Sequence, residues 1–101
     1  MAELSLDLSS AHLKIVCDIL KKHVPDYSVW AFGSRVTGRA KPYSDLDLAV
    51  ITNRPLALSV SAALMDDFSA SDLPIKIDVV DWANTSEVFR KIILRNKLII
   101  Q

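Results

Sequence analysis

Aspartate and apolar residues alternate in the segment from Asp45 to Val50. Alternation with a period of two is typical of a β-strand whose two faces differ in polarity. The strand would place Leu46 and Leu48 on an apolar face, with Asp45 and Asp47 on the opposite face. A single Asp-x-Asp pair is more often a solvated strand face. Because aspartate is depleted in strands, the neighbouring segments decide whether this pair binds a cation.

A second strand, predicted from Val29 to Phe32, ends at Gly33-Ser34, and ten residues separate Ser34 from Asp45. Small side chains let backbone N–H groups approach a ligand closely, so such a turn can hold a phosphate. The loop that follows contains three basic residues and no acidic residue, namely Arg35, Arg39 and Lys41. A positive loop between a phosphate turn and paired carboxylates is the charge arrangement of a nucleoside triphosphate site.

A third carboxylate comes from the alternating segment Ile75 to Val80, which predicts another strand. Its apolar face would carry Ile77, and Asp78 would lie on the opposite face. If this strand lies beside the first, the carboxylates meet and repel one another unless divalent cations bind. Asp81 is the competing candidate. Its side chain should point to the core side or leave the strand end, so Asp78 is preferred.

The remaining elements are predicted from apolar periodicity and capping residues. These are an extended arm over 1–8, helices over 9–23, 56–68 and 84–93, the last opened by an Asn84-x-x-Glu87 capping box, and an edge strand over 98–100. The order helix, strand, strand, helix, strand, helix predicts an α/β (α+β) domain. We expect a small mixed sheet with helices packed on one face and the acidic site on the other. A single domain should span residues 1–101.

Composition restricts the partners. Twelve basic and twelve acidic side chains balance, so net charge predicts binding neither to nucleic acid nor to a membrane. The single cysteine, Cys17, lies in a helical apolar pattern and excludes a disulfide within the chain. Without a signal peptide or an apolar run of transmembrane length, we expect a cytoplasmic protein.

The quoted residues also match a known family. The segment 32–35, Gly38 and the segment 44–48 together resemble the signature of the DNA polymerase beta-like nucleotidyltransferase superfamily, and most closely its minimal nucleotidyltransferase (MNT) branch. The resemblance covers nearly the whole chain. It implies the polymerase beta-like fold, ATP as substrate and two Mg²⁺ ions. Its catalytic and metal-binding residues would be Asp45, Asp47 and Asp78.

The resemblance also implies roles for the phosphate turn and its loop. Gly33 and Ser34 would hold the triphosphate, Arg35 would neutralise its charge, and Ser44 would orient the nucleotide site or form a turn. Asp78 would help to deprotonate the acceptor hydroxyl.

Members of the MNT branch act as antitoxins by adenylylating a small helical HEPN-type toxin. We therefore expect AMP transfer to a hydroxyl group, most plausibly a tyrosine, of such a partner, within a homo- or hetero-oligomer. Two other classes stay open. The chain could be a nucleotide-binding or regulatory module without turnover, or a structural domain with a solvated acidic face.

Overall fold

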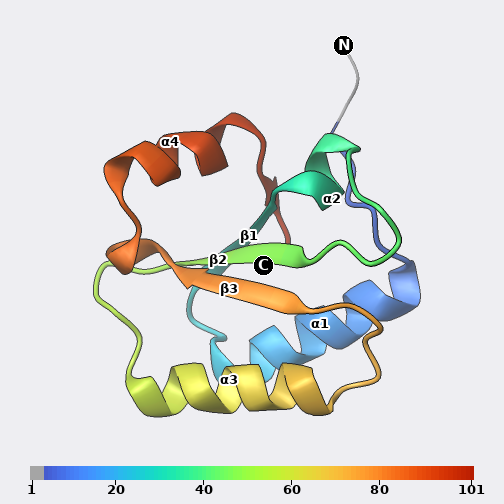
Figure 1. Cartoon of the computed structure of the whole chain (residues 1–101). Coiled ribbons are helices and arrows are strands. Elements are labelled where there is room, and N and C mark those ends of the chain that lie inside the picture. Colours follow the sequence, from blue (N-terminus) through green and yellow to red (C-terminus); the bar gives the residue numbers. More distant parts are fainter. Residues whose placement is uncertain (1–3) are drawn as a thin grey trace.

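The computed structural model describes residues 4–101, which form one mixed β-sheet with helices on both of its faces (Figure 1). The strands are β1 (Ser28–Phe32), β2 (Leu46–Ile51), β3 (Ile77–Asp81) and β4 (Leu98–Ile99). They form a four-stranded sheet in the order β3-β2-β1-β4. The pairs β1–β2 and β1–β4 are antiparallel, and β2–β3 is parallel. The expected mixed sheet is confirmed.

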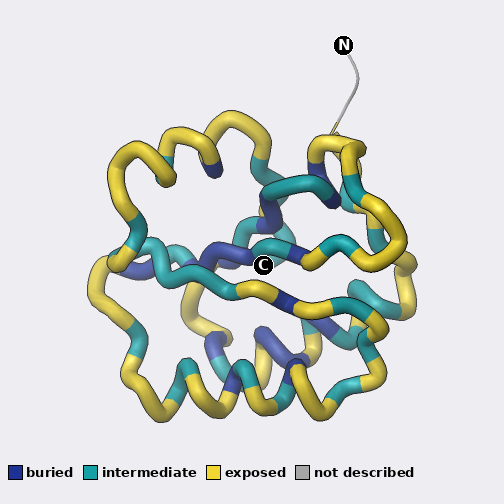
Figure 2. The backbone as a smooth tube through the Cα atoms, in the orientation of Figure 1, coloured by how far each residue is buried: buried dark blue, intermediate teal, exposed yellow. Residues whose placement is uncertain are grey.

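The main hydrophobic core lies on the sheet face opposite to Asp47 and Asp78. It is covered by α1 (Ser10–His23) and by α3 (Leu58–Ala70), which also makes the crossover that the parallel β2–β3 pair requires (Figure 1). The residues Leu46, Leu48 and Val50 alternate into this core, and each is fully buried. In Figure 2 the buried residues are concentrated in the central strands. Among the described residues, no helix is long and apolar enough to cross a membrane.

The predicted arrangement of the helices was wrong in one respect, because α4 (Glu87–Arg95) lies on the same face as the aspartates (Figure 1). The physical reason is that only one end of this face is acidic. Beside and beyond Asp47 the face is apolar, and there Phe32 and Ala49 are buried with Ile93 of α4. Trp30 and Trp82 pack against this group. An apolar surface of this kind has to be covered, and α4 covers it.

Serine caps set where α1 and α4 begin. Ser9 caps α1, and its hydroxyl accepts a hydrogen bond from the His12 N–H at 3.2 Å. The cap predicted for the last helix was wrong, because Asn84 ends a 3-10 turn, η1 (Trp82–Asn84). Ser86 caps α4 instead, and its Oγ accepts from the Phe89 N–H at 3.1 Å. A Ser at this position satisfies one of the N–H groups that a helix start leaves unpaired.

Both ends of the described chain are attached to the domain. Leu6 and Leu8 of the predicted N-terminal arm pack against the main core, whereas residues 1–3 of that prediction lie outside the described part. At the other end, the Gln101 carbonyl accepts from the Val29 N–H at 3.0 Å. The Gln101 amide donates to the Val24 carbonyl at 2.8 Å. The C-terminal residues therefore complete the sheet edge at β1.

Asp81 joins the end of β3 to the loop that follows β2. Its carboxylate accepts hydrogen bonds from the Thr52 hydroxyl, from the Leu56 N–H at 2.6 Å and from the Ala83 N–H at 3.3 Å. The strand register pairs Asp81 with Val50, which faces the main core. Asp81 is thus a structural carboxylate directed away from the acidic face, as the alternation predicts.

Replacing Asp81 by Ala should lower the free energy of unfolding by about 2–4 kcal/mol, because donors in a partly buried loop would lose a charged acceptor. Urea denaturation measures this loss. Asp78→Ala is the matched control, since Asp78 is exposed, and it should change stability by no more than about 0.5 kcal/mol. Equal losses for the two variants would contradict the structural role of Asp81.

Candidate active site

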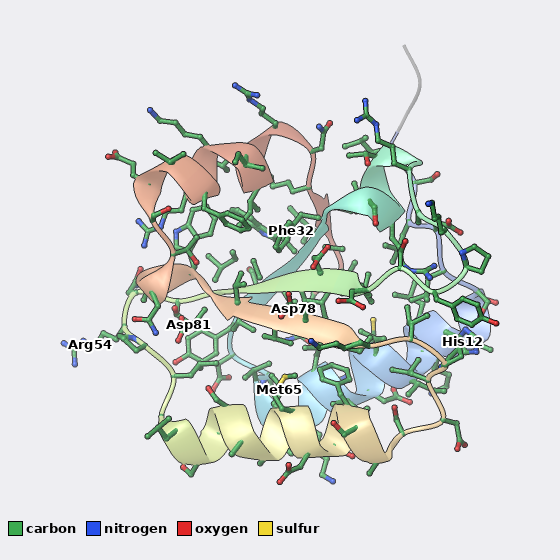
Figure 3. All side chains as sticks on the ribbon, in the orientation of Figure 1. His12, Phe32, Arg54, Met65, Asp78 and Asp81 are labelled. Atoms are coloured by element: carbon green, nitrogen blue, oxygen red, sulfur yellow. The ribbon has the colours of Figure 1, made fainter. Side chains whose placement is uncertain are left out.

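The strand register brings two predicted aspartates side by side. β2 and β3 run parallel, and Asp47 is paired directly with Asp78. Adjacent strands lie about 4.8 Å apart, so these two side chains leave the same face within reach of one ligand. Asp45 immediately precedes β2, two positions from Asp47, and is exposed. Figure 3 shows Asp78 on β3, with Asp81 at the far end of the same strand. The three predicted acids are thus gathered at one end of the sheet.

The turn after β1 passes directly over the carboxylate of Asp47. Phe32, the last residue of β1, is paired with Asp47, and the next residue, Gly33, has φ +81° and ψ −159°. A Cβ atom at Gly33 would lie 2.2 Å from Oδ2 of Asp47. Only glycine combines this backbone conformation with so close an approach. Ser34 follows at the start of the short helix α2 (Ser34–Thr37), where it is half-buried.

Electrostatics couple the three acids. The pKa of Asp47 is raised, first by its burial and then by the negative charges of Asp78 and Asp45. A carboxylate in this position is costly to ionise, and a divalent cation reverses that cost. Carboxylate oxygens are the hard donors that Mg²⁺ prefers, so the donor set fits this ion. Within residues 4–101 no three acidic, histidine or cysteine side chains already converge on one point.

Arg35 occupies a different place from the one predicted. Its side chain is only 6% exposed. The guanidinium donates to the main-chain carbonyls of Asp7 at 2.7 Å, Ser44 at 2.9 Å, Pro42 at 3.0 Å and Lys41 at 3.4 Å. These carbonyls engage most of its N–H groups, so Arg35 offers no exposed charge to a triphosphate. The expectation of direct charge neutralisation by Arg35 is therefore corrected.

Ser44 closes the turn that leads into Asp45. Its Oγ accepts from the Lys41 N–H at 2.8 Å, and its own N–H donates to the Lys41 carbonyl at 3.0 Å. Of the two roles considered for Ser44, the structure gives it that of a turn residue. The positive charges that remain exposed on this loop belong to Arg39 and Lys41.

An aromatic cluster borders the acidic site, a feature that was not predicted from the sequence. Phe32 and Phe89 meet edge to face with ring centroids 5.8 Å apart. Trp30 and Trp82 do the same at 5.3 Å, and the Lys97 ammonium lies 3.8 Å from the Trp30 ring centre. The signal was present in the sequence, since Trp30 and Phe32 alternate onto one face of their strand. Only the pairing with β2 shows that this face is the acidic one.

Gly33→Ala should disrupt the site more than Gly38→Ala does. Both glycines have positive φ, +81° and +78°, but a Cβ at Gly38 would meet nothing within 4 Å. Each variant should lose about 1–2 kcal/mol from backbone strain, and Gly33→Ala should in addition displace the Asp47 carboxylate. Urea denaturation and calorimetric titration with Mg-ATP measure the two effects. Equal nucleotide binding by both variants would contradict the close approach of the turn to Asp47.

Solved structures share this fold. A toxin–antitoxin complex with AMP-PNP superposes with a TM-score of 0.73 at 23% identity, covering 88% of this chain and 72% of that one. The MNT antitoxin complex with the tri-AMPylated HEPN toxin of Shewanella oneidensis gives a TM-score of 0.68 at 21% identity, covering 93% of this chain and 72% of that chain. At these identities the likeness concerns the fold alone, and it confirms the predicted fold class.

Sequence relatives extend the likeness beyond the fold. Probable protein adenylyltransferase MntA of Haemophilus influenzae is 55% identical over 96 residues, which cover 95% of this chain and 84% of that protein. Residues 14–101 match the model of the family described as Polymerase beta, Nucleotidyltransferase. This range contains the phosphate turn and all three aspartates of the acidic site. The chain belongs to the polymerase beta nucleotidyltransferase family.

Proposed function

We propose that this protein transfers AMP from ATP to a hydroxyl group, that of a tyrosine, on a small HEPN-type protein, and thereby acts as an antitoxin. The observation that carries the proposal is the direct pairing of Asp47 with Asp78 beneath the Gly33 turn. The name of the Haemophilus relative and the toxin–antitoxin assemblies among the structural neighbours support it. ATP and an unpaired Cys17 fit a cytoplasmic location.

The chain offers one group for each part of the reaction. Asp45, Asp47 and Asp78 would hold two Mg²⁺ ions, which would neutralise phosphate charge and position the oxygens of an in-line displacement. Gly33 and Ser34 would bind the triphosphate, through main-chain N–H groups and the serine hydroxyl. Arg39 and Lys41 supply exposed positive charge beside this turn.

Asp78 lies on the edge strand β3, where an acceptor approaching from outside the sheet is nearest. In the transfer step the acceptor oxygen forms a bond to the α-phosphorus, and the bond to the bridging oxygen of the β-phosphate breaks. The acceptor proton passes to the carboxylate of Asp78, and pyrophosphate leaves. This geometry favours a large acceptor, such as another protein, because the acidic face is open at this edge.

The partner surface that we propose is the outer side of α4. Val88 is 73% exposed and Ile92 is 54% exposed, and they lie four positions apart on one helix stripe. Phe89 of the same helix contacts Phe32 beside the acidic site. An acceptor that reaches the aspartates would therefore meet this stripe, which Lys91 makes basic. Residues 98–101 complete the sheet edge, so within the C-terminal part of the chain α4 is the better candidate for docking.

The alternative function is a regulatory module that binds nucleotide and partner without turnover. It predicts the same complex and the same response to nucleotide, but no covalent product. The two experiments below separate binding from transfer.

Asp47→Asn should remove the response of thermal stability to Mg²⁺ and ATP. In the wild type, any ligand that binds only the native state raises Tm. Because the pKa of Asp47 is raised on folding, its ionisation costs the metal-free protein stability as pH rises above the ordinary aspartate range. The Asn variant avoids that cost and should be at least as stable as the metal-free wild type at pH 7. A wild-type Tm unchanged by Mg²⁺ with every nucleoside triphosphate would contradict the site.

Co-expression with the product of a neighbouring gene, followed by intact-mass analysis, tests the transfer itself. The partner should gain one or more AMP increments with the wild type and none with Asp45→Ala. Asp45 is exposed, so its loss should leave the fold and the complex intact. A complex whose partner carries no added mass would favour the regulatory module.

A further inference from the structure

The guanidinium of Arg35 lies where the N-terminal segment, α2 and the loop of residues 41–44 meet. We propose that Arg35 is a positioning residue, which fastens this loop to the N-terminal segment and so sets the position of Asp45. The inference deepens the proposed function, on which it rests for the metal-binding role of Asp45. It gives Asp7, which precedes α1 and lies outside the signature segments, a role in holding the loop beside the site.

The contact with the N-terminal segment runs in both directions. The Asp7 N–H donates to the Arg35 carbonyl at 2.7 Å, and Nη1 of Arg35 donates to the Asp7 carbonyl at 2.7 Å. The Asp7 residue is exposed, and its carboxylate forms no ion pair with Arg35. Main-chain atoms of Asp7 therefore make this connection, whatever side chain the residue carries.

The contact with the loop uses the other nitrogens of the guanidinium. Nε donates to Ser44, and Nη2 donates to Lys41 and Pro42. In the described part of the chain Arg35 forms no salt bridge, so carbonyl dipoles alone compensate its buried charge. The guanidinium donates from three nitrogens to four carbonyls. A lysine ammonium has three donors on a single nitrogen, so it cannot reproduce this spread of contacts.

The loop passes directly into the acidic site. Ser44, held by Nε of Arg35 at 2.9 Å, is bonded to Asp45, whereas Asp47 and Asp78 are held by the sheet. Asp45 precedes β2 and has no ladder partner of its own. Its distance from the other two carboxylates therefore depends on the loop, and the loop depends on Arg35. Groups that orient metal ligands in this way typically contribute about 10–100-fold to metal affinity or activity.

Arg35→Lys tests the proposal, with Arg54→Lys as the matched control. Arg54 is exposed, its side chain makes no hydrogen bond to residues 4–101, and Figure 3 shows it pointing away from Asp78. Amide hydrogen exchange of the metal-free proteins should be faster over residues 41–45 in Arg35→Lys and unchanged in Arg54→Lys. With ATP present, the Mg²⁺ concentration at half-maximal Tm shift should rise about tenfold or more for Arg35→Lys only.

A second pair of variants tests the connection without altering Arg35. Asp7→Pro removes the N–H that donates to the Arg35 carbonyl, and Asp7→Ala keeps it. Exchange over residues 41–45 should become faster in the Pro variant alone. This pair decides the question should Arg35→Lys fail to fold.

Three results would overturn the proposal. Unchanged amide exchange over residues 41–45 in both Arg35→Lys and Asp7→Pro would mean that the contacts of Arg35 do not hold the loop. Faster exchange with an unchanged Mg²⁺ midpoint would mean that the loop does not position Asp45. Weaker ATP binding by Arg35→Lys in the presence of EDTA would point to a direct triphosphate contact. A wild-type Tm that does not respond to Mg²⁺ would instead contradict the proposed function. The exchange data would still show separately whether Arg35 holds the loop of residues 41–44.

Discussion

Asp47 and Asp78 stand side by side on parallel strands, and the repulsion between their charges is the constraint on which the site depends. In the parallel pair of β2 and β3, the register places Asp47 directly beside Asp78. The two carboxylates are therefore neighbours whenever this register forms. The pKa of Asp47 is raised first by its burial and then by this repulsion. A divalent cation relieves the repulsion. The site is thus arranged for a ligand that compensates its charge.

Apolar burial on the opposite face of the sheet stabilises the fold and offsets the repulsion between the aspartates. Leu46, Leu48 and Val50 alternate with the acidic side and are completely buried against α1 and α3. Burial of such side chains contributes roughly 1.5–3 kcal/mol each. The same three β-strand positions therefore hold the strand in place and direct its aspartates outward. The aromatic cluster under α4 covers the apolar part of the acidic face and leaves Asp45 and Asp78 exposed.

Where sequence reasoning succeeded, a short-range pattern determined the outcome. The alternation around Asp45 and Asp47 predicted β2, and the alternation around Asp78 placed that residue on the face opposite to Ile77. The reasoning failed where a side chain is used by a distant segment. Arg35 was predicted to bind phosphate because the sequence gives its charge but does not give the carbonyl groups to which it donates in the folded chain. The position of α4 was missed because helical periodicity marks an apolar stripe without saying which sheet face it covers.

The sequence by itself determined the strands, their polar and apolar faces, and the residue types of the site, because strand alternation and glycine chemistry act over a few neighbouring residues. Only the tertiary structure decided which strands lie together, and hence that Asp47 meets Asp78. It also decided that Asp81 holds the loop after β2 and that Arg35 joins three segments. These outcomes depend on contacts between residues far apart in the chain, and no local pattern encodes such contacts.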